Sequence, residues 1–386
     1  MVYKVEPLDL NALFMPVAAA TAALVRLDER LAHSPVREGW TERQHFADAA
    51  ATLWLEGELV HLEDLVLHDA HMNIRMPTHE LTRAHAVLRV RRQILANRPD
   101  WALSIDGLRQ LTGNGKANGA NSGQGGIASA FPLTQDAVAE REDRHMEAQM
   151  KQRNITAPDE LTLALQGVDA ALERSEKVLD GQMAQTRPGR LSTSERPELV
   201  YDLDWDEDQR LAEWQEVMGK TRSLPAALRA AILIDAWGDS EVLQRAAWLG
   251  PLLVAALLRQ DGLAVHHLPS CSLGAKQIPR ERRRARDRTE RLVALVEAIG
   301  EAAKLGLKEH DRLMLARAQM VRRVGEKRTS SRLPALIGFV LTRPLISSGM
   351  VQQALKVSKQ GALNLISELG LREITGRGRF RAWGVL

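Results

Sequence analysis

The C-terminal segment, residues 333–386, carries the side chains whose types and spacing best suit chemistry with another molecule. Polar groups follow one face of a short predicted helix that begins after Ser358, and basic groups alternate along the segment that follows it. Amide and ammonium groups can hydrogen-bond to base edges in a major groove, and guanidinium groups bind phosphates. We therefore predict a site for double-stranded DNA that consists of Ser358, Lys359, Gln360, Asn364, Arg377, Arg379 and Arg381.

Three short helices and a hairpin would position these residues. The apolar spacing predicts helices over residues 333–342, 348–355 and 358–369. Pro344 separates the first helix from the second, a turn at Lys356-Val357 separates the second from the third, and Gly370 ends the third. Two short strands are expected around residues 376–378, with Trp383 packing the hairpin against the helices. This order is typical of a winged helix-turn-helix domain. Such a domain can also bind proteins, and the alternating arginines favour DNA.

Charge is distributed unevenly along the 386 residues, whose net charge is +3. Residues 276–386 contain 24 basic and 10 acidic side chains, or +14, whereas the other residues contain 28 basic and 39 acidic ones, or −11. An acidic body with a basic C-terminal third is expected to meet a polyanion through that third only. The single cysteine, Cys271, excludes a disulfide framework within the chain and fits a reducing cytoplasm.

The composition predicts a mainly α-helical protein, because aromatic residues make up 4% of the chain and few stretches alternate as strands do. The apolar stretch 13–25 is shorter than a membrane span and is expected to be a buried helix, so no membrane contact is predicted. Further helices are expected at residues 10–32, 41–67 (one or two, capped by Thr41), 78–97, 136–151, 159–179, 205–218, 224–237, 242–260, 279–300 and 307–324. The predicted domains are an N-terminal helical domain (1–110), a flexible Gly/Asn-rich linker (111–131), a helical core (132–328) and the winged helix-turn-helix (329–386).

Several other groups of residues have a structural interpretation that we favour. Arg89, Arg91 and Arg92 are expected to form a solvated helix face, and Trp54, Trp237 and Trp248 to lie in the core. The basic run 281–288 fits a DNA-backbone contact and a solvated face equally well. Two further groups, one rich in histidine and one that ends at Cys271, contain side chains of the types that bind metals. Ion pairs or helix-end contacts explain both groups better. We therefore predict no metal, no cofactor and no catalytic residue in either group, which consist of His61, His68, Asp69, His71 and His79, and of His266, His267 and Cys271.

Three parts of the chain resemble the Fic (filamentation-induced) family of adenylyltransferases. Thr52, Glu56 and Gly57 fit the inhibitory-helix pattern, in which Ser or Thr precedes Glu by four residues and Gly or Asn follows. Residues 224–231 and 252–262 resemble the helices that flank the catalytic loop, and the C-terminal segment resembles the winged helix at the end of many Fic proteins. The resemblance implies a helical Fic-like core.

The catalytic loop of that family is His-Pro-Phe-x-x-Gly-Asn-Gly-Arg, in which the His is the general base and the Gly and Arg residues hold phosphates. Residues 238–250 of this chain read GDSEVLQRAAWLG, with no histidine, no glycine-rich turn and no arginine at that spacing. Without a base, a target hydroxyl stays protonated. We expect a Fic-like scaffold without Fic chemistry, and an AMP-transferring enzyme with an atypical site is the alternative.

Over nearly its full length the chain also resembles a group of rhizobial, largely plasmid-associated proteins described as DNA-binding, through residues 54–70, 76–89 and the C-terminal domain. The resemblance implies DNA binding and no further activity. From the predicted winged helix and the charge distribution we expect a cytoplasmic, sequence-specific DNA-binding protein, in particular a transcriptional regulator. Its acidic body would form a homodimer or sense a partner. A protein-interaction module, such as an antitoxin or a plasmid-maintenance component, is the other alternative.

Overall fold

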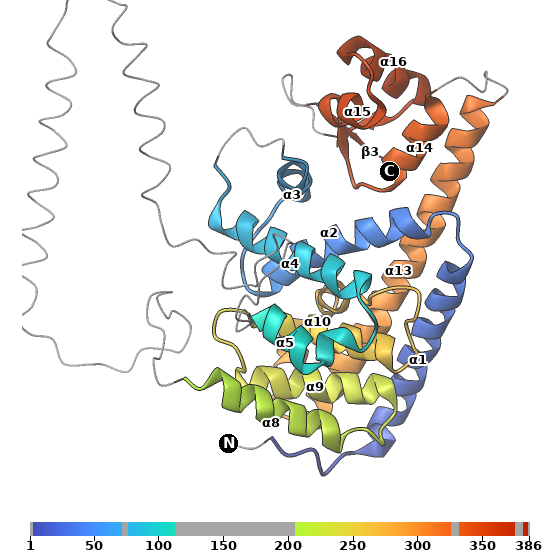
Figure 1. The fold of residues 1–386 in the computed structure, drawn as a ribbon. Helices are drawn as coiled ribbons and strands as arrows, with labels where there is room; N and C mark the ends of the chain where they lie inside the picture. Colours follow the sequence, from blue (N-terminus) through green and yellow to red (C-terminus); the bar gives the residue numbers. More distant parts are fainter. Residues whose placement is uncertain (1–2, 72–75, 113–204, 326–331, 375–380, 385–386) are drawn as a thin grey trace, which may run out of the picture. The chain divides into compact units, whose positions relative to one another are not determined.

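The computed structural model describes residues 3–71, 76–112, 205–325, 332–374 and 381–384 (Figure 1). These residues are mainly α-helical, as the composition predicted. The predicted Gly/Asn-rich linker from residue 113 onward, the predicted helices at 136–151 and 159–179, and Arg377 and Arg379 lie outside the described residues.

The helices of the body fall on both sides of the undescribed stretch 113–204. Those before it are α1 (Leu10–Ala32), α2 (Arg37–Leu55), α3 (Leu62–Asp69), α4 (His79–Ala96), the 3-10 turn η1 (Trp101–Leu103) and α5 (Ile105–Thr112). Those after it are α8 (Glu207–Lys220), α9 (Ala226–Ser240), α10 (Leu249–Gln260), α11 (Cys271–Ala275), α12 (Arg280–Arg283) and α13 (Arg288–Val324).

The 37-residue helix α13 is the axis on which the body packs, and α1 runs beside its first half (Figure 1). We predicted two helices here, separated between Gly300 and Leu307, and that prediction was wrong. Gly300 and Gly306 do not end the helix, because both keep helical backbone and face α1 instead. A Cβ at Gly306 would lie 2.7 Å from Leu27 Cδ2, so the missing side chain allows the two helices to approach closely.

The helix α1 combines a buried face with an exposed one. Leu13, Leu24 and Leu31 are buried, whereas Phe14 is 70% exposed, so the predicted buried helix at 13–25 is right for one face only. Among the described helices, α1 is the one with the length and apolar content to cross a membrane, and a third of its apolar window is buried inside the fold.

Two predicted helix starts were also wrong. The helix α2 begins at Arg37 with Val36 as its N-cap residue, so Thr41 lies inside the helix rather than capping it. The helix α10 begins at Leu249, because Glu241 takes a left-handed conformation that ends α9 (φ +43°). Residues 242–248 then form a loop in which Val242, Leu243 and Trp248 are buried without helical geometry.

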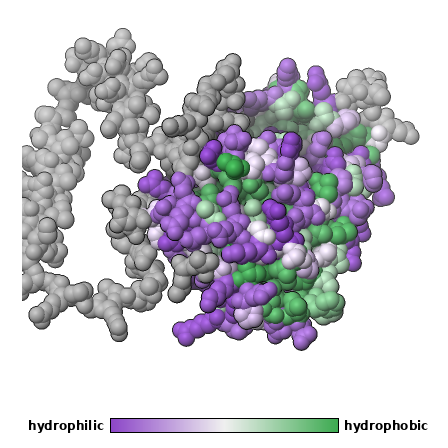
Figure 2. All heavy atoms as spheres, turned by 60° about the horizontal axis from the view of Figure 1, so that its bottom comes forward, coloured by the Kyte–Doolittle hydropathy of each residue, from purple (hydrophilic) through white to green (hydrophobic). Residues whose placement is uncertain are grey.

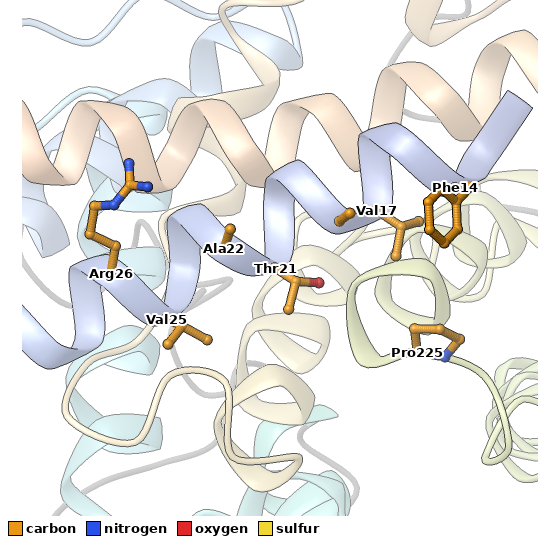
Figure 3. A pocket seen from close by; sticks show the side chains of 8 residues that line it. Phe14, Val17, Thr21, Ala22, Val25, Arg26 and Pro225 are labelled. Atoms are coloured by element: carbon orange, nitrogen blue, oxygen red, sulfur yellow. The ribbon is translucent and has the colours of Figure 1, made fainter.

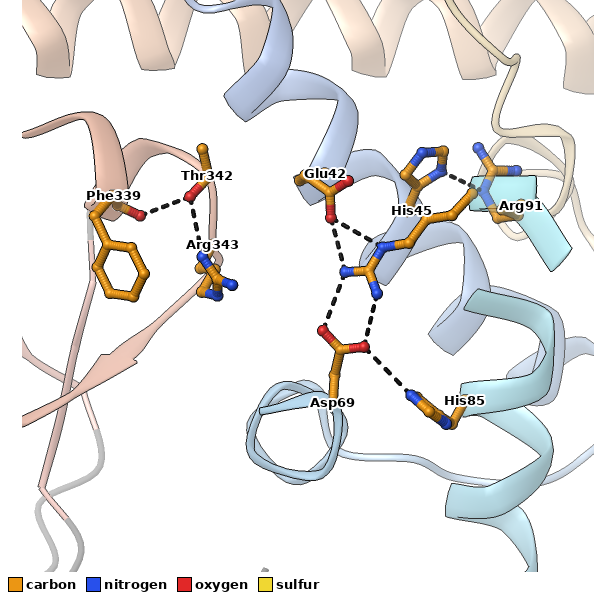
Figure 4. Close-up of polar contacts among 9 residues, drawn as sticks. Glu42, His45, Asp69, His85, Arg91, Phe339, Thr342 and Arg343 are labelled. Atoms are coloured by element: carbon orange, nitrogen blue, oxygen red, sulfur yellow. Dashed lines mark hydrogen bonds and ion pairs between the residues drawn. The ribbon is translucent and has the colours of Figure 1, made fainter. Parts of the chain in front are cut away.

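Of the three arginines predicted to form a solvated face of α4, Arg91 is instead among the most buried polar side chains of the described residues. Arg91 is fully buried and forms an ion pair with Asp48 of α2. It also donates to Leu268 O (3.2 Å) in the segment before α11 and to Nδ1 of His45 (3.3 Å), as Figure 4 shows for His45. Arg91 therefore joins three elements far apart in sequence, and a fully paired buried charge is tolerated where an unpaired one is not.

The neighbouring guanidinium and one tryptophan also depart from the predictions. Arg92 is partly buried and bridges Glu42 (2.7 Å) and Asp69 (2.7 Å), the two carboxylates that converge in Figure 4. Trp54 is 43% exposed and lies beneath Lys276 Nζ, 5.0 Å from its ring centroid, so it is not a core residue. Arg89 is exposed as predicted, and Trp237 and Trp248 are buried as predicted.

Replacing Arg91 by Met should lower the free energy of unfolding by about 3–5 kcal/mol, because it leaves the Asp48 carboxylate buried without its partner. Urea denaturation followed by tryptophan fluorescence measures this change. The matched control is Arg89→Met on the exposed face of the same helix, which should change stability by no more than about 0.5 kcal/mol. Equal effects of the two substitutions would contradict the structural role assigned to Arg91.

Candidate DNA interface

The C-terminal domain consists of α14 (Leu333–Leu341), β1 (Ile346–Ser347), α15 (Ser348–Leu355), α16 (Lys359–Leu369), β2 (Arg372–Glu373) and β3 (Ala382–Gly384). The strands form an antiparallel sheet in the order β1-β3-β2, with Trp383 of β3 opposite both Ile346 and Glu373. Trp383 is buried, which confirms that it packs the hairpin onto the domain. The strand β1 was not predicted, because two residues are too few to show alternation.

The helix α16 begins and ends where the sequence predicted. The Ser358 side chain accepts a hydrogen bond from Gly361 N at 3.1 Å, which caps the first turn. Gly370 adopts the left-handed conformation (φ +68°) that ends the helix. Ala362, Ile366 and Leu369 are buried, and this fixes which face of α16 looks outward.

The outward face presents the polar side chains predicted to meet DNA. Lys359, Gln360 and Asn364 are exposed among the described residues. Gln360 Nε2 donates to Asn364 Oδ1 at 2.9 Å, so the two amides lie side by side one turn apart. Gln360 Oε1 and Asn364 Nδ2 are not used in this bond and can accept from and donate to another molecule. These three side chains lie in the first part of the helix, and Lys359 adds a positive charge there. The arrangement therefore favours the N-terminal half of α16 as the part that approaches an anion.

Of the three arginines predicted in the hairpin, Arg381 is described. It is exposed, its Nε donates to Glu373 Oε2 at 2.8 Å, and its guanidinium lies 5.2 Å from the Trp383 ring centroid. Two further exposed cations, Lys356 and Arg372, lie in the turn before α16 and at the start of β2. The prediction did not include them, although their charge and their place in the same segment pointed to the same surface.

The domain is attached to the body at the C-terminal end of α14. The buried side chain of Arg43, from α2, donates to Leu341 O (2.9 Å) and to Val340 O (3.1 Å), two carbonyls that lack a partner within the helix. Burial lowers the pKa of Arg43 to about 10, which keeps it charged at neutral pH. A Cβ at Gly39 would lie 2.7 Å from Leu341 O, so α2 can approach this end because position 39 is glycine.

A second arginine holds the end of α16. Arg323, in the last turn of α13, donates from Nη1 to Leu369 O (3.1 Å) and to Gly370 O (3.0 Å). A cation at the C-terminal end of a helix is also favoured by the helix dipole. The helix whose polar face looks outward is therefore positioned by the long helix of the body.

The positions that resemble the Fic family make contacts within the body. Thr52 donates to Asp48 O (2.8 Å), Glu56 pairs with Arg83 of α4, and Gly57 has φ +93° at the turn after α2. In the loop between α9 and α10, Val242 and Leu243 are buried. The residues that carry the resemblance thus contribute to the packing of the body.

The two histidines that precede Cys271 also have partners within the fold. Asp28 accepts hydrogen bonds from the backbone and ring of His266 and meets His267 Nδ1 at 2.9 Å. Burial acts to raise the pKa of Asp28, and the two histidines outweigh this effect and bring it to about 2. Burial raises the pKa of Cys271 to about 12, so its thiol is unsuited to act as a nucleophile. No group of three or more potential metal ligands occurs in the part of the chain that the structure describes.

The basic run at 281–288 is partly neutralised. Arg282 pairs with Glu297 at 2.6 Å, and Arg283 donates to Ile278 O at 3.0 Å. Arg288 donates to Val5 O at 2.9 Å, which joins the start of α13 to the N-terminal segment. These three side chains support the solvated, structural interpretation of the run.

Replacing Arg323 by Met should loosen the end of α16, because the carbonyls of Leu369 and Gly370 lose their donor. Amide exchange in the last turn of α16 should accelerate about five-fold, which corresponds to about 1 kcal/mol. Arg322→Met removes an exposed cation from the same turn of α13 and is the matched control. Unchanged exchange in Arg323→Met would contradict the anchoring role.

Comparison with known proteins assigns this architecture to a family. Residues 333–386 match a family described as an HTH DNA binding domain, and residues 199–325 match one described as a protein of unknown function (DUF1612). A protein of Sinorhizobium fredii, titled uncharacterized protein y4cF, is 46% identical over 390 residues and is covered over the full length of both chains. Neither description nor that title names an enzymatic activity. The chain therefore belongs to the rhizobial family of y4cF, which joins a Fic-like, mainly helical body to a C-terminal helix-turn-helix DNA-binding domain.

Proposed function

We propose that the chain is a sequence-specific DNA-binding protein that acts as a transcriptional regulator in the cytoplasm. The observation that carries the proposal is the outward face of α16, where Lys359, Gln360 and Asn364 are exposed on a helix whose two ends are fixed. An element that reads bases must hold a few hydrogen-bonding groups at a rigid protein surface, and amides pair well with adenine edges.

The C-terminal domain fits the winged type of helix-turn-helix. The order of its elements, one strand after the first helix and two after the third, and the sheet order β1-β3-β2 support this assignment. We propose that α16 enters the major groove by its N-terminal half, because Lys359, Gln360 and Asn364 lie in that half. Arg377, Arg379 and Arg381, in and beside the β2–β3 hairpin, would then contact the backbone or an adjacent minor groove.

The remaining chain would supply the scaffold for this domain. We propose a division into residues 1–110, 111–131, 132–328 and 329–386, and the helix-turn-helix match at 333–386 supports the last boundary. Arg323 and Arg43 belong to the body and hold α16 and α14, which supports a body that orients the DNA-facing helix. A second copy of the chain is a further proposed partner, since dimers of such domains read paired half-sites.

Replacing Arg377, Arg379 and Arg381 together by Ala should weaken binding to any duplex and make the dependence of affinity on salt shallower. Removing one arginine–phosphate interaction should reduce the slope of log K against log salt by about 0.9. Fluorescence anisotropy with a labelled duplex at several salt concentrations measures the slope. The control with the same charge change is the triple Ala variant of the exposed body arginines Arg89, Arg98 and Arg222. An unchanged slope in the hairpin variant, or an equal decrease in the control, would refute the hairpin assignment.

Replacing Gln360 or Asn364 by Ala should relax base preference rather than abolish binding. The preference is the difference in binding free energy between a duplex selected from a random pool and its single-base mutants. This difference should be smaller by about 1–3 kcal/mol in the Ala-substituted proteins than in the wild-type protein. Because the two amides are hydrogen-bonded to each other, the double variant should lose less than the sum of the single ones. Gln353→Ala, an exposed amide on α15, is the matched control. Full retention of base preference in both α16 variants would remove α16 as the reading element.

A further inference from the structure

Several large apolar side chains are exposed along one helix, α1. Leu10 is 61% exposed, Phe14 70%, Met15 69% and Val25 42%, and Ala18 and Ala22 between them are also exposed. These six residues form the α1 outer face. Figure 2 shows that hydrophobic side chains gather on one side of the described surface. Contiguous apolar patches of this kind on a folded chain mark sites of interaction.

The α1 outer face is hollowed as well as apolar. A groove of about 630 Å³ runs along it, and Phe14, Thr21 and Val25 point to the same side of the helix, toward Pro225 at the start of α9 (Figure 3). Its walls are almost entirely carbon, so the groove suits an apolar side chain rather than a charged ligand.

We propose that a second copy of the chain binds to the α1 outer face, with the two α1 helices antiparallel and crossing at Ala18. Phe14, Ala18, Ala22 and Arg26 follow each other at intervals of four residues and form one ridge. A two-fold axis through Ala18 places Phe14 of each copy over Ala22 of the other. The large residue meets the small one twice, and the two alanines at the centre allow the helices to approach closely.

Charge at the ends of the ridge fits the same arrangement. The register that pairs Phe14 with Ala22 brings the exposed guanidinium of Arg26 to the level of Leu10 and Asp9 in the other copy. Asp9 is exposed, and only its Oδ1 accepts the bonds that cap its own helix. A parallel arrangement would instead place Arg26 beside Arg26 and Phe14 beside Phe14. The surface is therefore complementary to itself in the antiparallel sense.

The proposed dimer does not depend on DNA. The α1 outer face lies beside the first half of α13, and Arg323, which anchors α16, comes 23 residues after Gly300, the residue that packs on Ala20. That distance is about 35 Å along the helix. A monomeric variant should therefore bind a duplex with one site as the wild type does, and the dimer and the DNA site can fail separately.

Cysteine cross-linking tests the register. In the full chain, Ala18→Cys should form a disulfide-linked dimer under mild oxidation. The two-fold axis brings the Cα atoms of the two copies of position 18 to the separation that a disulfide requires, about 4.4–6.8 Å. Val25→Cys is the matched exposed position, and its two copies would be about 21 Å apart along the helices. The native Cys271 is buried and does not compete. Cross-linking at both positions, at position 25 alone or at neither overturns the proposal.

Sedimentation equilibrium tests the surface without a new thiol. The wild-type chain should show a mass of twice 42.8 kDa at micromolar concentration. Phe14→Glu should weaken the association at least ten-fold, so this variant should show the mass of the monomer. Leu315→Glu, on an equally exposed apolar position of α13, is the control and should stay dimeric. Circular dichroism checks that both variants keep their helices. A monomeric wild type, an unaffected Phe14→Glu dimer, or a wild-type monomer that co-sediments with phosphatidylcholine vesicles would overturn the proposal.

Discussion

Two arginines of the body bind the carbonyl ends of two helices in the C-terminal domain, and the direction in which α16 faces depends on them. Arg43 donates to the end of α14 and Arg323 to the end of α16. Carbonyls at a helix end have no partner within the helix, and a guanidinium provides several donors in one plane. Because α13 is continuous up to Arg323, the position of α16 is coupled to the packing of the whole body.

The parts of the fold that local chemistry decides could be predicted. Ser358, Gly370 and the apolar spacing of α16 indicated its two ends and its buried face, since capping and periodicity act within a few residues. The parts that tertiary contacts decide could not. Gly300 and Gly306 looked like helix breaks and are close-packing positions, and Arg91 looked like a solvated side chain and is buried against Asp48. A helix pattern gives no information on which polar residue will find a partner far away in sequence.

The candidate site follows the same division. The exposed amides of α16 could be found from the sequence, because a helix with one apolar face must present the other. The anchoring by Arg43 and Arg323 could not be found, because the partners are backbone carbonyls about 300 and 46 residues away. In the body, the positions that suggested nucleotide chemistry, such as Thr52 and Glu56, bind a helix carbonyl and an arginine. The body thus retains a scaffold in which polar groups hold helices together.

The central claim is that the outward face of α16 lies against DNA bases. A photo-cross-linking residue at position 364, in a full-length chain bound to a duplex selected from a random pool, tests it most directly. We expect cross-links from position 364 to bases within the selected site, and none from the same residue placed at the exposed position 353 of α15. Tight binding of the duplex with cross-links from position 353 and none from position 364 would contradict the account.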